Sequence, residues 1–243
     1  MREIVFDTET TGIAPDHPDE KERDRVVEIG CVELINLERT GAEFHIYLNP
    51  ERHVSEEVVR VHGLTREFLN NHPKFADVVQ QFLDFVGDAP LVAHNAGFDR
   101  NFINAELRRI GLPLLPDERF VDTLALAKKK YPGASCSLDA LARRLRLDAR
   151  GFDLAARKGA GGHGALLDSR MLAEIYLELK GGREQRFDFG GAVKAMIAQT
   201  GIFHAKKAPR PVPLPPRIDA DEEAAHAAFI GELGADALWR KYG

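Results

Sequence analysis

The order in which strand-type and helix-type patterns follow one another constrains the fold of this chain more than any other feature. Three strand-type segments come first, at residues 3–6, 26–37 and 43–48, and Gly41 is predicted to mark the turn between the last two. Helix and strand patterns then alternate. Helices are predicted after Ser55 and over residues 75–86, 98–110, 123–130, 138–145 and 165–179, and strands over 91–93 and around Val121. A meander followed by alternating elements predicts an α/β domain.

The composition is typical of a soluble globular protein. The chain has 243 residues, 44% of them hydrophobic and 29% charged, which is enough to bury a full core. Cys31 and Cys136 lie far apart and form no C-x-x-C pair, so neither a disulfide framework nor a zinc site is indicated, and a cytoplasmic location is expected. Because no apolar stretch reaches the roughly 18 to 20 residues that a membrane span requires, neither export nor membrane insertion is expected.

The last quarter of the chain differs from the rest. Five prolines between residues 209 and 216 cannot lie in a helix or an inner strand, so this stretch is predicted to be a semi-extended linker. Helical character returns from Asp219 to Tyr242. We therefore predict a catalytic domain over residues 1–180, a linker over 181–216 and a helical tail over 217–243.

The first strand ends in two acidic residues. Asp7 and Glu9 are two positions apart, so the pleat of a strand directs both carboxylates to one face, while Thr8 points to the other. Two carboxylates this close repel each other, and a divalent cation is the strongest remedy near neutral pH. The alternative for the pair alone is two solvated acids at the end of a strand.

Three more residues with possible chemical roles occur further along the chain. Asp99 follows a strand and a glycine-containing turn, where its alternative role is to cap a helix. His163 lies in a glycine-rich loop, and Asp168 lies inside the following helix among leucines. A buried aspartate needs a partner, and a metal ion is one.

Together these residues resemble the DEDDh exonuclease family. The resemblance rests on three motifs, which are Phe6-Asp7-Thr8-Glu9-Thr10-Thr11-Gly12, His94-Asn95-Ala96-Gly97-Phe98-Asp99 and His163-Gly164-Ala165-Leu166-Leu167-Asp168. It covers residues 1–180 and implies a ribonuclease-H-like fold, a mixed five-stranded sheet flanked by helices with the acids at its edge. The run from Gly159 to Gly162 is richer in glycine than is usual for the family.

The resemblance also implies a mechanism. Two divalent ions, Mg²⁺ or Mn²⁺, would be held by Asp7, Glu9, Asp99 and Asp168, with Asp7 bridging the two. Glu9 and Asp168 would complete the site that generates hydroxide, and Asp99 would steady the second ion. His163, whose ordinary pKa is about 6.5, is expected to act as the general base.

Further residues are expected to contact the substrate beside Asp7, Glu9 and Asp168. By resemblance, Glu57 and His62 lie next to the terminal nucleotide, although Glu57 can equally be an exposed helix acid. Gly12, with the neighbouring Thr11, would let the backbone approach the 3' nucleotide, and Phe98 either stacks on a base or fills the core.

The C-terminal part of the chain suggests partners. Glu184, Phe187 and Phe189 resemble a short motif that binds sliding clamps, with a plain linker as the alternative, and Leu238 and Trp239 resemble a tail that binds a polymerase subunit. The tail favours the proofreading branch of the family, which acts on single-stranded or frayed 3' DNA ends. The net charge of −5 then fits weak intrinsic affinity for DNA, because tethering raises the local concentration of primer ends.

Two other functions remain open on the sequence. An exoribonuclease or oligoribonuclease would share all the catalytic residues, and only the tail argues against it. A mainly structural polymerase subunit would not need the five chemical positions, all of which are intact in this chain.

Overall fold

The computed structural model describes residues 1–155, 161–181 and 220–233. The chain divides into two units, Met1–Gln185 and Arg186–Gly243. The predicted clamp motif at Glu184, Phe187 and Phe189 and the predicted polymerase contacts at Leu238 and Trp239 lie outside the described residues. The boundaries at residues 180 and 216 therefore stay a prediction.

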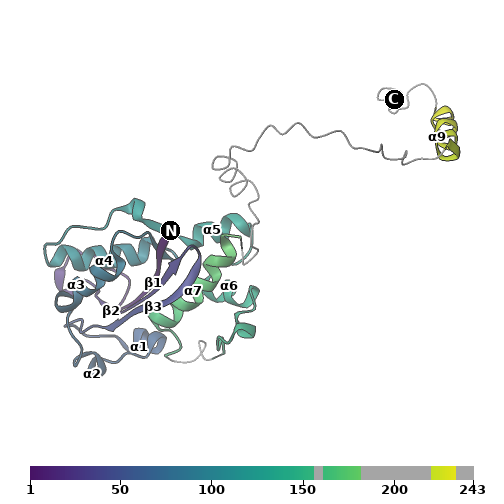
Figure 1. Cartoon of the computed structure of the whole chain (residues 1–243). Helices are drawn as coiled ribbons and strands as arrows, with labels where there is room; N and C mark the ends of the chain where they lie inside the picture. Colours follow the sequence, from purple (N-terminus) through teal and green to yellow (C-terminus); the bar gives the residue numbers. More distant parts are fainter. Residues whose placement is uncertain (156–160, 182–219, 234–243) are drawn as a thin grey trace, which may run out of the picture. The chain divides into compact units, whose positions relative to one another are not determined.

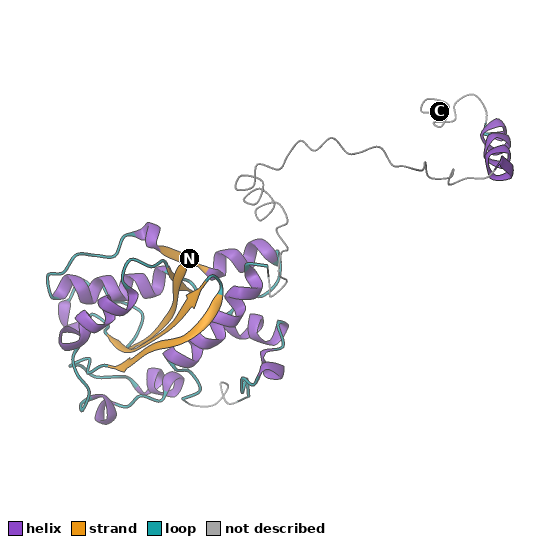
Figure 2. Cartoon of the chain, viewed as in Figure 1, coloured by secondary structure: helices purple, strands orange, loops and turns teal. Residues whose placement is uncertain are grey.

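The first unit is built on a mixed five-stranded sheet in the order β3-β2-β1-β4-β5. Helices lie around this sheet (Figure 2). Its strands are β1 (Arg2–Thr10), β2 (Val26–Ile35), β3 (Glu38–Tyr47), β4 (Leu91–Ala93) and β5 (Phe120–Asp122). The first three strands pair antiparallel, whereas β4 pairs parallel with β1 and β5 parallel with β4. The predicted meander and the predicted five-stranded mixed sheet are confirmed.

The turn between β2 and β3 was predicted at the wrong place. Ile35 pairs with Glu38, so Asn36 and Leu37 form a two-residue turn, and both have positive φ, 53° and 65°. Positive φ at both positions matches the twist of a hairpin, and asparagine tolerates it, whereas leucine there gives no sequence signal of a turn. Gly41 instead lies inside β3, which begins at Glu38 rather than at residue 43.

The predicted helices occur within one or two residues of their expected bounds. They are α1 (Glu56–His62), α3 (Phe75–Val86), α4 (Gly97–Arg109), α5 (Thr123–Lys130), α6 (Leu138–Arg144) and α7 (Ala165–Leu179). Ser55 caps α1 as expected, with its hydroxyl oxygen accepting from the Val58 amide. The short α2 (Arg66–Leu69) was not predicted.

The second unit contains one described helix, α9 (Ala220–Glu232), which begins one residue after the predicted start of the tail helix. The side chains of residues 221–229 are exposed, and Phe229 is 55% exposed. Within the described parts of the chain, every helix is too short or too polar to cross a membrane.

Helices α3 and α4 lie on one side of the sheet and α7 on the other (Figure 1), and alternate residues of β1 pack against these two layers. Ile4 and Phe6 belong to a buried cluster with residues of α3 and α4, whereas Val5 packs with Leu172 and Tyr176 of α7. The sheet is therefore covered on both faces, and the pleat of β1 decides which layer each of its side chains meets.

Helix α7 lies on the sheet where β2 has no side chain. A Cβ atom at Gly30 would overlap the backbone of Ala165 and Leu166, so glycine is needed for this close approach. The hydroxyl of Ser169 donates to the Gly30 carbonyl over 2.8 Å, and the Tyr176 hydroxyl donates to Glu3 over 2.7 Å. These contacts set the position of α7 along β1 and β2.

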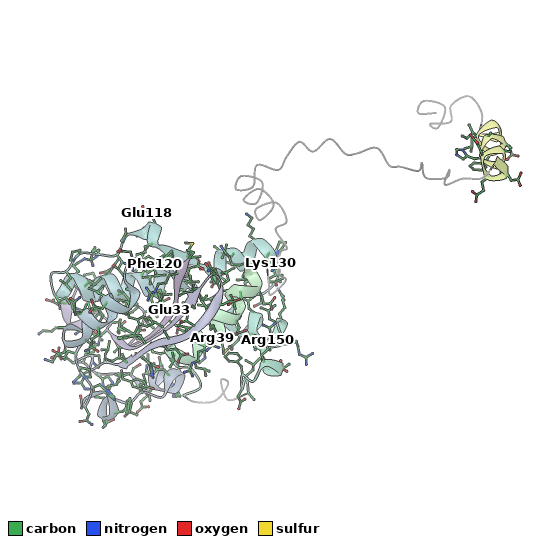
Figure 3. The ribbon with its side chains drawn as sticks, viewed as in Figure 1. Glu33, Arg39, Glu118, Phe120, Lys130 and Arg150 are labelled. Atoms are coloured by element: carbon green, nitrogen blue, oxygen red, sulfur yellow. The ribbon has the colours of Figure 1, made fainter. Side chains whose placement is uncertain are left out.

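Charged side chains also approach α7 from its solvent side. Arg39 of β3 and Arg150 of the 3-10 helix Leu147–Arg150 reach the buried Glu174 at 3.8 and 3.4 Å; both arginines are labelled in Figure 3. Arg150 also pairs with Glu178 at 2.7 Å. The outer face of α7 is therefore anchored as well as the inner face.

A buried ion cluster ties α4 to the start of β2. Glu106, only 2% exposed, accepts two hydrogen bonds from Arg25, at 2.6 and 2.8 Å, and one from Arg109 at 3.2 Å. The Val26 amide also donates to Glu106. Breaking such a cluster on one side leaves buried charge without a counter-ion.

We expect Glu106→Ala to lower the free energy of unfolding by about 3 to 5 kcal/mol, because two partly buried arginines lose their common partner. Urea denaturation followed by circular dichroism measures this. The matched control is Asp16→Ala, which removes the exposed Asp16–Arg108 pair at 2.8 Å and should cost less than about 1 kcal/mol. Equal losses in the two variants would contradict a stabilising role for the cluster.

Candidate active site

The fold brings the two N-terminal acids against the start of α7. Asp7 pairs with Gly30 and Glu9 with Glu28 across β1 and β2, so both acids lie on the sheet face that α7 covers. Asp168 lies in the first turn of α7 and is 4% exposed. The close packing at Gly30 therefore carries a third carboxylate to this end of the sheet.

Three of the predicted residues converge on one point. One ligand atom each from Glu9, His163 and Asp168 lies within 4.8 Å of the others. The Nδ1 atom of His163 is 3.4 Å from a carboxylate oxygen of Asp168, and the His163 side chain is about one third exposed. An imidazole thus stands between a buried acid and solvent, where a water molecule can reach it.

Asp99 is held from the other side of β1. It lies in the first turn of α4, 2% exposed, and one of its oxygens accepts from the Thr8 amide at 3.0 Å and the Thr8 hydroxyl at 2.7 Å. The predicted opposite orientation of Thr8 is therefore observed. The alternative role of Asp99 as a helix cap is not, because the N-cap residue of α4 is Ala96.

Burial raises the pKa of Asp99 to about 7, and the two hydrogen bonds from Thr8 oppose this shift. A cation near the carboxylate would favour its charged form. Asp99 therefore lies against Thr8, on the opposite face of β1 from Asp7 and Glu9. Its buried environment disfavours the charged carboxylate unless a positive charge lies nearby.

The loop after β1 is organised by an aspartate that the sequence did not single out. Asp24 accepts from the Thr11 hydroxyl at 2.8 Å and from the Ala14 amide at 2.9 Å. A Cβ atom at Gly12 would overlap the Asp24 carboxylate. The need for glycine at position 12 thus has a packing reason in addition to the predicted approach to substrate. Asp24 lies in a charged segment with no motif, so only the tertiary contacts reveal it.

His62 is buried, and its predicted contact with substrate stays a prediction. It is 4% exposed, and its Nδ1 atom accepts from the Leu64 amide at 3.0 Å, so the proton of the neutral ring is on Nε2. Burial lowers the pKa of His62, the backbone of Thr10 opposes this, and the nearby His163 lowers it further. The Nε2 atom is buried and makes no hydrogen bond within the described residues.

The predicted substrate residues Glu57 and Phe98 lie in different settings. Glu57 is exposed in the first turn of α1. Phe98 is half-buried and packs against Phe102 with ring centroids 4.8 Å apart. Part of Phe98 thus fills the core, as one of its two predicted roles requires, and its contact with substrate stays a prediction, as does that of Glu57.

The donor atoms suit a hard divalent cation. Glu9 and Asp168 offer carboxylate oxygens, Asp7 lies on the same strand face as Glu9, and His163 adds an imidazole nitrogen at the more exposed side. Mg²⁺ and Mn²⁺ favour oxygen ligands of this kind. The residues present therefore fit a divalent metal site.

Comparisons with known proteins agree with this site. The family model described as "Exonuclease" matches residues 4–176. A DNA polymerase III subunit epsilon of Rickettsia conorii is 43% identical over 190 residues, covering 77% of each chain. Another, of Pasteurella multocida, is 38% identical over 251 residues, covering 99% of this chain and 94% of its own. The solved nuclease domain of 3'hExo, a DEDDh family member bound to rAMP, has the same fold, with TM-score 0.56 and 17% identity over 74% of this chain and 91% of that one.

The chain therefore belongs to the exonuclease family and has the fold of its DEDDh members. Enzymes of this type generally depend on divalent metal ions. Within the family, the curated relatives at 36–43% identity are bacterial DNA polymerase III epsilon subunits. Because the Pasteurella relative covers 99% of this chain, the likeness includes the C-terminal region.

Replacing Gly30 by alanine should damage the site without touching any acid. The added Cβ must push α7 away from β2, which moves Asp168 from Glu9, so we expect weaker Mn²⁺ binding and a loss of about 1 to 3 kcal/mol in stability. Titration of Mn²⁺ by electron paramagnetic resonance and a thermal melt measure the two effects.

Gly111→Ala is the control, because φ there is +72° but an added Cβ would meet nothing within 4 Å. It should be less stable while binding Mn²⁺ normally. Unchanged Mn²⁺ affinity in the Gly30→Ala variant would show that the spacing of α7 and β2 does not set the metal site.

Proposed function

We propose that this chain is a 3'-to-5' DNA exonuclease that removes mispaired nucleotides from primer ends as the proofreading subunit of the replicative DNA polymerase III. The convergence of Glu9, His163 and Asp168 at the end of β1 is the observation that carries the proposal. The full-length likeness to DNA polymerase III epsilon subunits supports the replicative role over other functions of the same fold. The cytoplasm is the compartment in which such a subunit would work.

Asp7, Glu9, Asp99 and Asp168 would hold two divalent ions, Mg²⁺ or Mn²⁺. When bound, these ions neutralise charge on the scissile phosphate and lower the pKa of water. Asp99 would contribute from the opposite face of β1, where Thr8 donates two hydrogen bonds to one of its oxygens. The carboxylates thus define where the phosphate of the terminal nucleotide must lie.

His163 would accept the proton of the attacking water. Its partial exposure lets water approach the ring, and the Asp168 oxygen 3.4 Å from Nδ1 restrains the ring's orientation. Imidazole suits the task because its ordinary pKa of about 6.5 is close to neutral pH. The proton passes from the ring to solvent after cleavage, so the group is ready for the next nucleotide.

The acidic net charge of −5 is consistent with this role. A paired terminus must melt before it can enter the site, and weak binding does not compensate the free energy of melting, so correctly paired ends are protected. A mispair lowers the cost of melting. Attachment to a polymerase raises the local concentration of primer ends and removes the need for tight binding.

The double variant Asp7→Ala/Glu9→Ala should lose hydrolysis of 3'-labelled single-stranded DNA by more than about 1000-fold, because two of the proposed metal-binding carboxylates disappear. Gel electrophoresis of the labelled products in Mg²⁺ measures this. Glu20→Ala/Glu22→Ala is the control, since it removes two acids with the same spacing outside the site. Retained hydrolysis in the Asp7/Glu9 variant would sink the catalytic assignment.

Single-stranded DNA and RNA of the same sequence distinguish proofreading from its nearest alternative. We expect DNA to be degraded faster than RNA, and chelation by EDTA to stop both reactions. A strong preference for RNA would instead identify an exoribonuclease or oligoribonuclease.

The C-terminal region is proposed to bind the partners. Removing residues 217–243 should leave hydrolysis of single-stranded DNA unchanged but abolish binding to the DNA polymerase III alpha subunit, because the acids all lie in residues 7–168. Surface plasmon resonance with immobilised alpha subunit measures the binding. Replacing Phe187 and Phe189 by alanine should weaken binding to the beta sliding clamp only. Intact binding of the truncated chain to the alpha subunit would refute the tail assignment.

A further inference from the structure

The loop that carries His163 is attached to the C-terminal end of α1 through its backbone. The Gly161 amide donates to the Arg60 carbonyl over 3.1 Å, and the His163 amide donates to the Val61 carbonyl over 3.4 Å. Carbonyls in the last turn of a helix have no partner within that helix, so the loop supplies hydrogen bonds that α1 itself cannot. The backbone of His163 is thus held by α1 as well as by the start of α7.

Two glycines make this attachment close. A Cβ atom at Gly63 would lie 3.0 Å from the Cα of Gly161, and a Cβ atom at Gly161 would lie 3.3 Å from the Cα of Gly63. Both residues also have positive φ, +77° and +74°. The backbones of the two segments therefore touch at two residues without side chains, and a methyl group on either residue would separate the segments.

The end of α1 is a rigid support for such a contact. Leu64, next to Gly63, belongs to a buried cluster with Val27, Val54 and Leu69, and His62 on the other side of Gly63 is itself buried. The loop, in contrast, has two adjacent glycines, Gly161 and Gly162, directly before His163, and glycine has little conformational preference of its own. Its course near His163 must be determined by what it contacts.

We propose that Gly63 is a positioning residue for His163: its contact with Gly161 sets how far the loop lies from α1, and hence where the imidazole stands relative to Asp168. In this role Gly63 acts through the backbone of the loop, by its contact with Gly161. The inference rests on the proposed hydrolytic function and adds to it a residue outside the acidic motifs.

Gly63→Ala tests the proposal, with Gly133→Ala as a matched control. Gly133 has the same φ of +77°, but a Cβ there would meet nothing within 4 Å. Both variants bear the backbone strain of alanine at positive φ, and only Gly63→Ala separates the loop from α1. We expect kcat for single-stranded DNA to fall about 100-fold in Gly63→Ala, with KM little changed, and to stay near wild type in Gly133→Ala.

A double-mutant cycle separates positioning from general damage. If Gly63 acts through His163, Gly63→Ala should cause no further loss of kcat in a His163→Ala background. DNA binding in EDTA, measured by fluorescence anisotropy, should be equal in all variants. Should Gly63→Ala not fold, Gly161→Ala imposes a milder version of the same separation from the other side.

The outcomes distinguish the inference from the function on which it rests. An active wild type with an undiminished Gly63→Ala variant, or an equal loss of kcat with and without His163, would overturn the positioning role alone. An inactive wild type would overturn the proposed hydrolysis, and the positioning role with it.

Discussion

Helix α7 lies against the bare backbone of β2 at Gly30, and the rest of the site depends on that contact. With a side chain at position 30, Ala165 and Leu166 could not reach the sheet, and Asp168 would not lie beside Glu9. The hydroxyl of Ser169 and the ring of Tyr176 hold the helix along its length once it is in place. A packing constraint therefore sets the spacing of the acids, which are the groups least inclined to approach one another.

Gathering carboxylates in this way costs stability, and the surrounding structure offsets it. Asp99 is fully enclosed and its pKa is raised to about 7 by burial, yet two hydrogen bonds from Thr8 keep it in place. Elsewhere, Glu106 with Arg25 and Arg109 joins α4 to β2, and Glu174 with Arg39 and Arg150 anchors the outside of α7. The domain thus gathers carboxylates at one end of β1, and ion pairs of Glu106 and Glu174 with arginines hold the surrounding elements in place.

Much of this arrangement could be predicted because it is local. The period-2 pattern of β1 placed Asp7 and Glu9 opposite Thr8, and Ser55 marked the start of α1. Errors arose where a residue's role depended on its neighbours in space. Gly41 was taken for a turn, although Asn36 and Leu37 make it. The contact of Asp24 with Gly12 was not foreseen, and the approach of Gly12 to substrate stays a prediction.

By itself, the sequence determined the order of strands and helices and the face of β1 on which Asp7 and Glu9 lie, and its motifs singled out the five residues proposed to have chemical roles, because pleat, helix period and motif are properties of short segments. Only the tertiary structure decided which of those residues meet, how buried Asp99 and His62 are, and that the His163 loop rests on Gly63. The physical reason is that burial and close backbone contact depend on segments far apart in the chain, and no local pattern records which of them meet.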